Sequence, residues 1–311
     1  MKKLLISAFA AAVLLLFGGV NEANGDPLEY EIEGETVAVV GCDKNASGEL
    51  VIPSSYNGKP VISIGSYAFN SCSSLSSVTI PDSVTSIGRF AFGYCSGLTS
   101  VTIPDSVTSI EQDAFWGCSN LMSVAIPDSV TSIENMTFRN CGNLTSVIIG
   151  NKVTSIGRWA FKDCRNLTNV TIPDSVTQIG SWAFSGCSSL KSITFEGNAP
   201  SSFGSDVFKN LPIGATITVT AGATGFGETY GGLTVQILKK KLVIKSFNNH
   251  ATPFSLTFET QPESAYKIEA SHDLKKWGEI GEVQGTGSSV EFTDWRKALF
   301  QKQYYRVKLV E

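Results

Sequence analysis

Apolar and polar residues alternate along this chain over short stretches, and the same pattern returns every 23 residues. Within residues 98–103, the apolar Leu98, Val101 and Ile103 share one face, and the hydroxyl residues between them share the other. Alternation with period two over so few residues indicates a short strand with one buried face. The chain is therefore expected to build many short strands rather than a few long ones.

Each repeat continues through a turn into a second, shorter apolar segment. The Pro-Asp pair at 104–105 breaks the strand, because proline fixes φ and aspartate can bond to nearby backbone amides. Val107 and Ile110 then predict a second inward-facing strand. Ala114 and Phe115 fit a tight helical turn in which the small residue permits close packing and the ring fills the interior. One repeat differs, with Gly-Asn-Lys at 150–152 in place of Pro-Asp-Ser, and we expect the turn to absorb that change.

Two residue types recur at fixed positions and define two expected interior columns. The first is a phenylalanine column: Phe69, Phe92, Phe115, Phe138, Phe161 and Phe184. The second is a cysteine column: Cys72, Cys95, Cys118, Cys141, Cys164 and Cys187. A constant period in this range with leucine at set positions is typical of a leucine-rich solenoid, whose stacked coils make one continuous core.

The cysteine column allows two interpretations, a disulfide framework or a set of buried free thiols. In-register strands ~4.8 Å apart keep the Cβ vectors parallel, and that separation exceeds the ~3.8 Å that a disulfide prefers. We therefore predict free thiols that each fill a small apolar notch. The spacing also differs from the C-x₂-C pattern that gathers sulfurs around zinc. Cys42 lies outside the column and is expected to be the most reactive thiol.

The repeat VTSIGRFAFGYCSGLTSVTIPDSV resembles the BspA-like leucine-rich repeat family of bacterial surface proteins and some protists. The resemblance extends over residues 50–195 and rests on six copies that agree in length and at the Ile, Phe, Cys and Leu positions. It implies a right-handed solenoid of α/β type, mostly β, with a β-hairpin cap at its N-terminal end. It also implies adhesion to host or matrix proteins such as fibronectin or fibrinogen.

The sequence divides into five expected segments. Residues 1–25 have a charged start, an apolar centre and small residues before Gly25, which predicts a secretory signal peptide cleaved after Gly25; an uncleaved anchor is the alternative. Residues 26–49 predict the hairpin cap and 50–198 the repeats. Residues 199–238 predict a C-terminal cap with a loop at 222–232. Six period-two runs in 239–311 predict a small all-β, sandwich-like module.

Candidate chemistry is sparse. A net charge of −4 with 17% charged residues and no basic run argues against nucleic acid as a partner. Of the two histidines, His250 and His272, the second lies in a Ser-His-Asp run, but adjacent residues point apart and do not make a triad. Aspartates at the Pro-Asp turns form a column that could attract calcium, although turn capping explains each one. We predict no catalytic residue, cofactor or metal, and an enzyme in the C-terminal module is the least favoured alternative.

The expected binding surface is the edge of the solenoid where aromatic and basic residues gather. Its members are Tyr67, Arg89, Phe90, Trp116, Arg139, Arg158, Trp159, Lys162 and Trp182. Exposed rings beside arginine are typical of interface hot spots, whereas rings lying flat over the turns as an apolar lid are the competing interpretation. The sequence thus predicts a monomeric, secreted or surface-displayed protein that binds an extracellular protein. A structural or carbohydrate-associated module of a secreted assembly is the alternative.

Overall fold

The computed structural model describes residues 26–238, 244–248, 254–260, 264–296 and 304–310. The signal peptide predicted at 1–25 lies outside these residues. The chain forms two compact units, a solenoid that ends near residue 236 and a C-terminal unit that begins at residue 237. All regular elements of the described residues are strands, β1 to β26. The α/β label and the helical turn expected at 114–115 are therefore not what the described chain shows, and the turns that replace it are analysed below.

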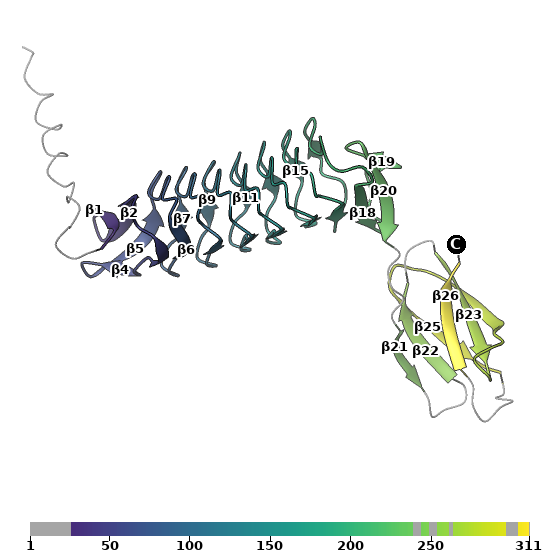
Figure 1. The fold of residues 1–311 in the computed structure, drawn as a ribbon. Coiled ribbons are helices and arrows are strands. Elements are labelled where there is room, and N and C mark those ends of the chain that lie inside the picture. Colours follow the sequence, from purple (N-terminus) through teal and green to yellow (C-terminus); the bar gives the residue numbers. More distant parts are fainter. Residues whose placement is uncertain (1–25, 239–243, 249–253, 261–263, 297–303, 311) are drawn as a thin grey trace, which may run out of the picture. The chain divides into compact units, whose positions relative to one another are not determined.

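The N-terminal end of the solenoid is a hairpin, as its alternating sequence predicts. Strands β1 (Leu28–Glu33) and β2 (Thr36–Cys42) pair antiparallel around a turn in which Gly34 has a φ of +60°. β2 then pairs in parallel with β5 (Lys59–Ile64), whose other neighbour outside the stack is the two-residue β4 (Ser55–Tyr56). The hairpin thereby covers the first edge of a stacked sheet, which would otherwise be open to pairing with another chain (Figure 1).

The longer strand of each coil stacks in parallel with its neighbours. These strands are β3 (Gly48–Val51), β6 (Leu75–Thr79), β8 (Ser100–Thr102), β10 (Ser123–Ala125) and β12 (Ser146–Ile148) in one sheet, and β14 (Asn169–Ile172), β16 (Ser192–Phe195) and β18 (Thr216–Thr220) in the next. The register pairs Val78 with Val101 and Val124 with Val147, so that valines lie above valines in the core. The alternate Ser and Thr residues form the outer face.

The shorter strands form a second stack on another side of each coil. They are β7 (Ser86–Ile87), β9 (Ser109–Ile110), β11 (Ser132–Ile133), β13 (Ser155–Ile156), β15 (Gln178–Ile179) and β17 (Ser202–Phe203). The turn between the two strands survives the sequence change at 150–152. Val153 N donates to Gly150 O at 3.1 Å, and Val130 N donates to Pro127 O at the same distance one repeat earlier.

The turn that carries the phenylalanine forms a third backbone ladder along the solenoid. Alternate amides donate to the following repeat: Asp113 N bonds Asn135 O at 3.0 Å and Phe115 N bonds Thr137 O at 2.9 Å. The amides between them bond three residues back, as Trp116 N does to Asp113 O. Because every second amide is used between repeats, the segment cannot make the continuous i→i−4 bonds of an α-helix.

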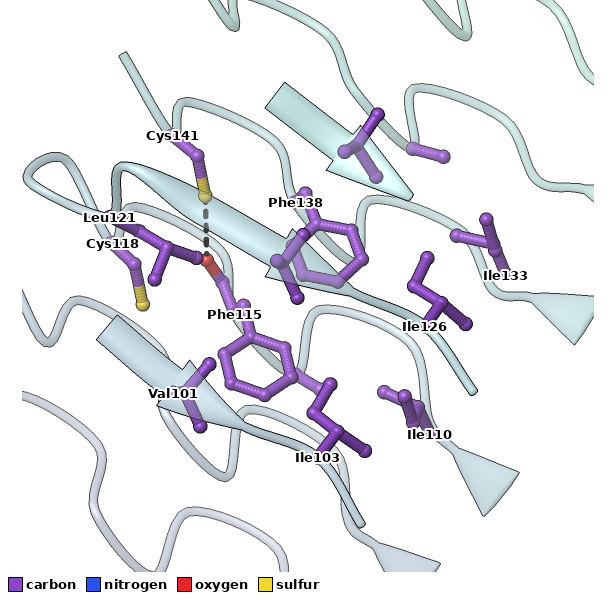
Figure 2. Close-up of a cluster of buried hydrophobic side chains, with 14 of the residues drawn as sticks. Val101, Ile103, Ile110, Phe115, Cys118, Leu121, Ile126, Ile133, Phe138 and Cys141 are labelled. Atoms are coloured by element: carbon purple, nitrogen blue, oxygen red, sulfur yellow. Dashed lines mark hydrogen bonds between the residues drawn. The ribbon is translucent and has the colours of Figure 1, made fainter. Parts of the chain in front are cut away.

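The core consists of the two columns that the repeat places inside each coil. Neighbouring rings of the phenylalanine column stack with centroids 4.9–5.4 Å apart and interplanar angles of 5–8°. Beside them, the cysteine thiols of one coil donate to phenylalanine carbonyls of the coil before, as Cys141 Sγ does to Phe115 O at 3.2 Å (Figure 2). All seven cysteines are buried free thiols.

The C-terminal end of the solenoid is closed by a hairpin and an aromatic cluster. In the sheet, β18 lies next to β20 (Leu233–Leu238). β20 in turn pairs antiparallel with β19 (Thr229–Tyr230). The loop expected at 222–232 therefore contains a strand, because the Tyr230 ring packs against Phe195, Phe203 and Phe226 and fixes this segment over the last coil.

The described residues of the C-terminal unit form six strands at the positions of the six alternating runs. They are β21 (Ile244–Asn248), β22 (Phe254–Glu259), β23 (Ala265–Ser271), β24 (Gly278–Gln284), β25 (Ser289–Asp294) and β26 (Tyr304–Leu309). They form two antiparallel three-stranded sheets, β21-β22-β25 and β24-β23-β26. Phe258 of the first sheet and Tyr266 and Ile268 of the second share one small core.

Candidate binding surface

The aromatic–arginine strip, our name for the nine residues Tyr67, Arg89, Phe90, Trp116, Arg139, Arg158, Trp159, Lys162 and Trp182, follows the turn ladder. Four of its aromatic residues, Tyr67, Phe90, Trp159 and Trp182, occupy a position that has positive φ in each coil, with values of 53–63°. This left-handed conformation is unfavourable for bulky residues and usually belongs to Gly, Asn or Asp. A large ring in this conformation suggests that its side chain has a role that offsets the backbone strain.

The rings of the strip form two stacked groups. In the first, Tyr67 stacks on Phe90 with centroids 5.2 Å apart, and Phe90 meets Trp116 at 5.5 Å with a tilt of 31°. In the second, Trp159 and Trp182 stack at 5.8 Å. The two groups are separated by the coil in which the same position is Met136. The rings of the strip therefore do not form one continuous stack, and the two ring groups do not contact each other directly.

Arginine connects the two ring groups. The Arg139 guanidinium carbon lies 4.9 Å from the Trp116 ring centre and 5.5 Å from that of Trp159, so it bridges the two groups. Arg158 lies over Trp159 at 3.7 Å and over Trp182 at 4.8 Å. A guanidinium that lies over a ring uses its flat face and keeps the N–H donors along its edge for other contacts.

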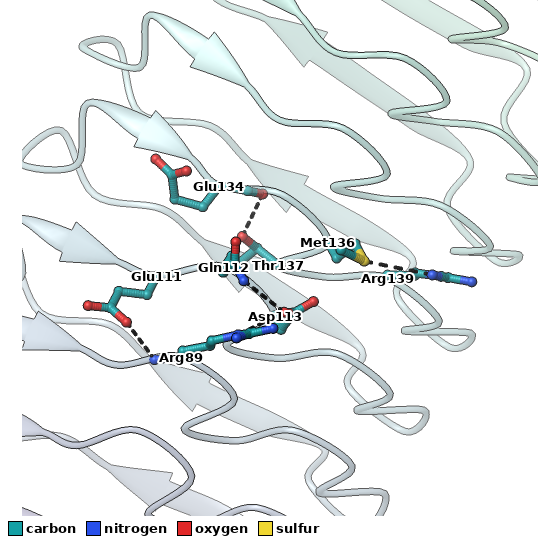
Figure 3. Close-up of polar contacts among 8 residues, drawn as sticks. All are labelled: Arg89, Glu111, Gln112, Asp113, Glu134, Met136, Thr137 and Arg139. Atoms are coloured by element: carbon teal, nitrogen blue, oxygen red, sulfur yellow. Dashed lines mark hydrogen bonds and ion pairs between the residues drawn. The ribbon is translucent and has the colours of Figure 1, made fainter.

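At the first ring group, the buried carboxylate of Asp113 contacts a residue of the strip. Arg89 Nε lies 3.3 Å from Asp113 Oδ2, and Glu111 accepts a hydrogen bond from the Arg89 backbone amide (Figure 3). Asp113 is only 1% exposed, and burial raises its pKa above the ordinary value although Arg89 opposes the rise. Asp113 was not expected as a strip residue, and neither was Tyr94, which meets Trp116 at 5.6 Å. Tyr94 occupies the position directly before Cys95, which has positive φ in each repeat. An aromatic residue at that position is the sequence signal that could have identified Tyr94.

Not all members of the strip are exposed as the sequence suggested. Tyr67 is 51% exposed, but Phe90 is only 9% exposed because Tyr67, Trp116 and Arg89 surround its ring. Phe90 is thus a packing element and not an exposed contact. The three tryptophans are half-buried, so that both interpretations, interface and lid, apply to part of each ring.

Polar groups of the strip differ in how far they are satisfied. Lys162 pairs with Asp163 at 3.0 Å, and Arg139 Nη1 lies 3.7 Å from Met136 Sδ. Trp116 Nε1 and Arg139 Nε are buried without a hydrogen-bond partner among the described residues. Buried donors of this kind are uncommon in folded proteins and call for an explanation. Here the cation–ring contacts hold both groups in place.

The outer face of the long-strand sheets offers a second, smaller feature. Ile148 is 67% exposed at a position that is threonine in most coils. It borders a hollow of about 570 Å³ whose lining includes Pro127, Asp128 and Lys152. Asp128 Oδ1 there accepts a hydrogen bond from Asn151 N at 2.6 Å, so this aspartate bonds the turn of the next coil and does not cap its own turn with that oxygen.

The remaining candidate chemistry is structural. Ser271 Oγ accepts from Leu274 N at 2.9 Å and lies 3.1 Å from Asp273 Oδ1, so the Ser-His-Asp run is a hydrogen-bonded turn. Lys276 and Lys275 amides donate to Asp273 and lower its pKa. Within the described ranges, no group of three or more His, Cys, Asp or Glu is placed to hold a metal. The same ranges contain no helix long and apolar enough to cross a membrane.

Comparison with known proteins shows which family and which solved structures this chain is similar to. The BspA type leucine rich repeat region matches residues 49–166 and 118–230, in six copies. The solved structure of a leucine-rich repeat protein of T. pallidum is 30% identical with a TM-score of 0.55, over 61% of this chain and 90% of that one. One from Eubacterium ventriosum is 25% identical with a TM-score of 0.51, over 65% of this chain and 54% of that one. No curated protein matches this chain.

The period, the stacked short strands and the turn ladder define a leucine-rich repeat solenoid. The chain belongs to the BspA-type leucine-rich repeat family, since the matched residues cover more than half of its length. The resemblance of the repeat to this family is thereby confirmed. The matched region ends before the C-terminal unit, which the family match leaves unassigned.

Proposed function

We propose that this protein is a secreted or surface-displayed, non-enzymatic binding protein that engages an extracellular protein through the aromatic–arginine strip. A solenoid presents a long rigid surface, and affinity can come from several coils that contact one extended partner. The single observation that carries the proposal is the repeated use of bulky rings at a left-handed backbone position. That choice costs stability in the coils of Tyr67, Trp159 and Trp182, so a role for these side chains at the surface explains it better than packing does.

The charge of the strip indicates the chemistry of its partner. Arg158 lies over Trp159 and Trp182 and is exposed, so its edge N–H groups are oriented before any partner arrives. A planar guanidinium of this kind matches a carboxylate in a two-point contact. On a chain with a net charge of −4, such a site favours an acidic segment of the partner over a basic one.

The test uses the purified mature chain and a panel of defined extracellular proteins, fibronectin and fibrinogen among them, in a surface-based binding assay. The variant Arg158→Gln with Trp182→Ala removes one guanidinium and one ring. We expect it to remain folded by circular dichroism and to lose at least tenfold in affinity, and we expect wild-type binding to weaken with salt because the contacts are ionic.

A matched control addresses the other exposed face. Thr102→Ala with Ser100→Ala removes two hydroxyls from the outer face of β8 and should leave binding unchanged. If that control loses the partner while the strip variant keeps it, the binding face is the sheet and the proposal is wrong. A second candidate is a carbohydrate-associated site on this sheet face, which the hollow beside Ile148 favours, and Ile148→Thr tests it directly.

A further inference from the structure

One thiol at the N-terminal end of the cysteine column differs from the rest. From Cys95 onward, each thiol donates to the carbonyl of a phenylalanine 26 residues earlier at 2.9–3.2 Å. Burial raises the pKa of these thiols, to about 12 for Cys95, Cys141 and Cys187. A thiol that is buried, bonded and protonated is unreactive, because the thiolate is the nucleophile.

Cys72 has no such carbonyl, because the hairpin cap takes the place of a preceding repeat. Its Sγ faces Cys42 O at 3.9 Å and Asp43 O at 4.0 Å, and Lys44 Nζ lies 3.9 Å away. Cys42 Sγ also lies 3.5 Å from Asp43 O, so both sulfurs approach the same carbonyl. The first cysteine of the column thus has long, weak contacts, a second thiol and an ammonium group around it.

The surroundings of this pair shift the pKa values of the two thiols in opposite directions. Hydrogen bonding from Cys42, followed by the nearby Lys44 ammonium, lowers the pKa of Cys72 to about 7 against the opposing effect of burial. The same hydrogen bond, together with burial, raises the pKa of Cys42. One member is therefore suited to exist as a thiolate near neutral pH, and the other remains a protonated donor.

The backbone also relieves this pair of the constraint that disfavours a disulfide within the column. Column neighbours are stacked in register, so their Cβ vectors run parallel. Cys42 lies opposite Leu28 at the end of the antiparallel hairpin, 30 residues before Cys72 and outside the in-register column, so the constraint of parallel Cβ vectors does not apply to this pair. Cys72 is 0% exposed and Cys42 is 5% exposed, whereas Asp43, Lys44 and Asn45, which follow Cys42, are exposed, so a small disulfide has to reach the pair by displacing this loop of the cap.

We propose that Cys42 and Cys72 form a thiol–disulfide exchange site that is oxidised by low-molecular-weight disulfides. The Cys72 thiolate attacks one sulfur of the disulfide, forms a mixed disulfide and releases one thiol. Cys42 then gives up its proton and attacks the Cys72 sulfur, which releases the second thiol and leaves a Cys42–Cys72 bond. One small disulfide is reduced to two thiols for each pair of protein thiols oxidised. The bond fastens the cap to the first repeat, so oxidation should raise the melting temperature.

The experiment incubates the folded full chain with oxidised glutathione and then counts thiols after denaturation. We expect five of the seven thiols to remain free and mass spectrometry to identify one peptide pair, joined through Cys42 and Cys72. With Cys42→Ser, glutathione should stay attached to Cys72, because the resolving thiol is missing. With Lys44→Gln, the pH midpoint of the reaction should move upward from about 7 and the rate at neutral pH should fall several-fold.

Cys95→Ser serves as the matched control, since it removes a column thiol outside the pair and should leave the Cys42–Cys72 bond unchanged. Seven free thiols after prolonged oxidation of the wild-type chain would overturn the proposal. So would a bond between two column cysteines. Both readouts use the unsubstituted protein, so they do not depend on whether a variant folds.

Discussion

Two sets of aromatic residues run along the same turns of this solenoid, one or two residues apart along the chain, and they differ in composition, exposure and ring geometry. The phenylalanine column is one residue type, buried, with rings within 8° of parallel. The strip mixes Tyr, Phe, Trp, Arg and Lys, is partly exposed, and contains ring tilts of about 30°. Both share the same backbone ladder, so the difference comes from the side chains.

The comparison separates what the repeat needs from what it tolerates. Inside the coil, the space between stacked strands is the same in each repeat, so one ring shape fits it throughout. At the strip the ladder fixes only the backbone, which even adopts a left-handed conformation for Trp159. Side chains there are free to vary in size and charge, and a surface that varies can recognise a partner.

Truncation of the interior column should have the largest effect. Phe115→Ala removes a fully buried ring with neighbours on both sides, and we expect it to cost ~3–5 kcal/mol of unfolding free energy. Because coils stabilise their neighbours, the loss should spread beyond one repeat. Urea unfolding followed by circular dichroism measures it. Met122→Ala, at an exposed position, is the control and should change stability by less than ~0.5 kcal/mol.

Truncation in the strip should cost less. Trp159→Ala removes a half-buried ring that contacts Trp182, Arg139 and Arg158, and we expect a loss of ~2 kcal/mol from the apolar area that becomes unburied. The same unfolding assay compares it with Phe115→Ala. Equal losses for the two variants would mean that the strip is an apolar lid, and the binding face would then have to be sought elsewhere.

The interior was predictable from the sequence because it depends on periodicity alone. A constant step placed Phe115 and Cys118 inside without any knowledge of the turn, and both are fully buried. Exposure in the strip was less predictable, since it depends on which neighbours cover a ring. Phe90 is covered by residues one repeat to either side, and the sequence shows the identity of these residues but not their direction.

The strand positions of the C-terminal unit followed from period-two alternation in the same way. Their pairing did not, because β22 lies between β21 and the distant β25, and β23 lies between β24 and the distant β26. Short-range patterns identify strands, whereas the choice among distant partners depends on the core that they build together. Cys72 illustrates the same limit, because its unusual surroundings arise where the repeat meets the hairpin cap.

The smallest expected effect, and the one that tests the base of the strip, concerns the pH dependence at Asp113. The pKa of this carboxyl is raised in the folded state, chiefly by burial, so the folded chain binds its proton more tightly than the unfolded chain does. Its contribution to stability therefore grows as the pH falls through the folded pKa towards the ordinary value, and is lost as the pH rises. Asp113→Asn removes this dependence, and asparagine tolerates the left-handed φ of 62° at this position.

The melting temperature of Asp113→Asn relative to wild type should accordingly be highest near pH 7 and should decline towards pH 4. Asp105→Asn, at an exposed turn, controls for the loss of one negative charge. The opposite trend, with the variant weakest at pH 7 and recovering in acid, would mean that the 3.3 Å pair with Arg89 outweighs burial. In that case Asp113 anchors Arg89 electrostatically, and the first ring group of the strip is held by an ion pair instead of by packing.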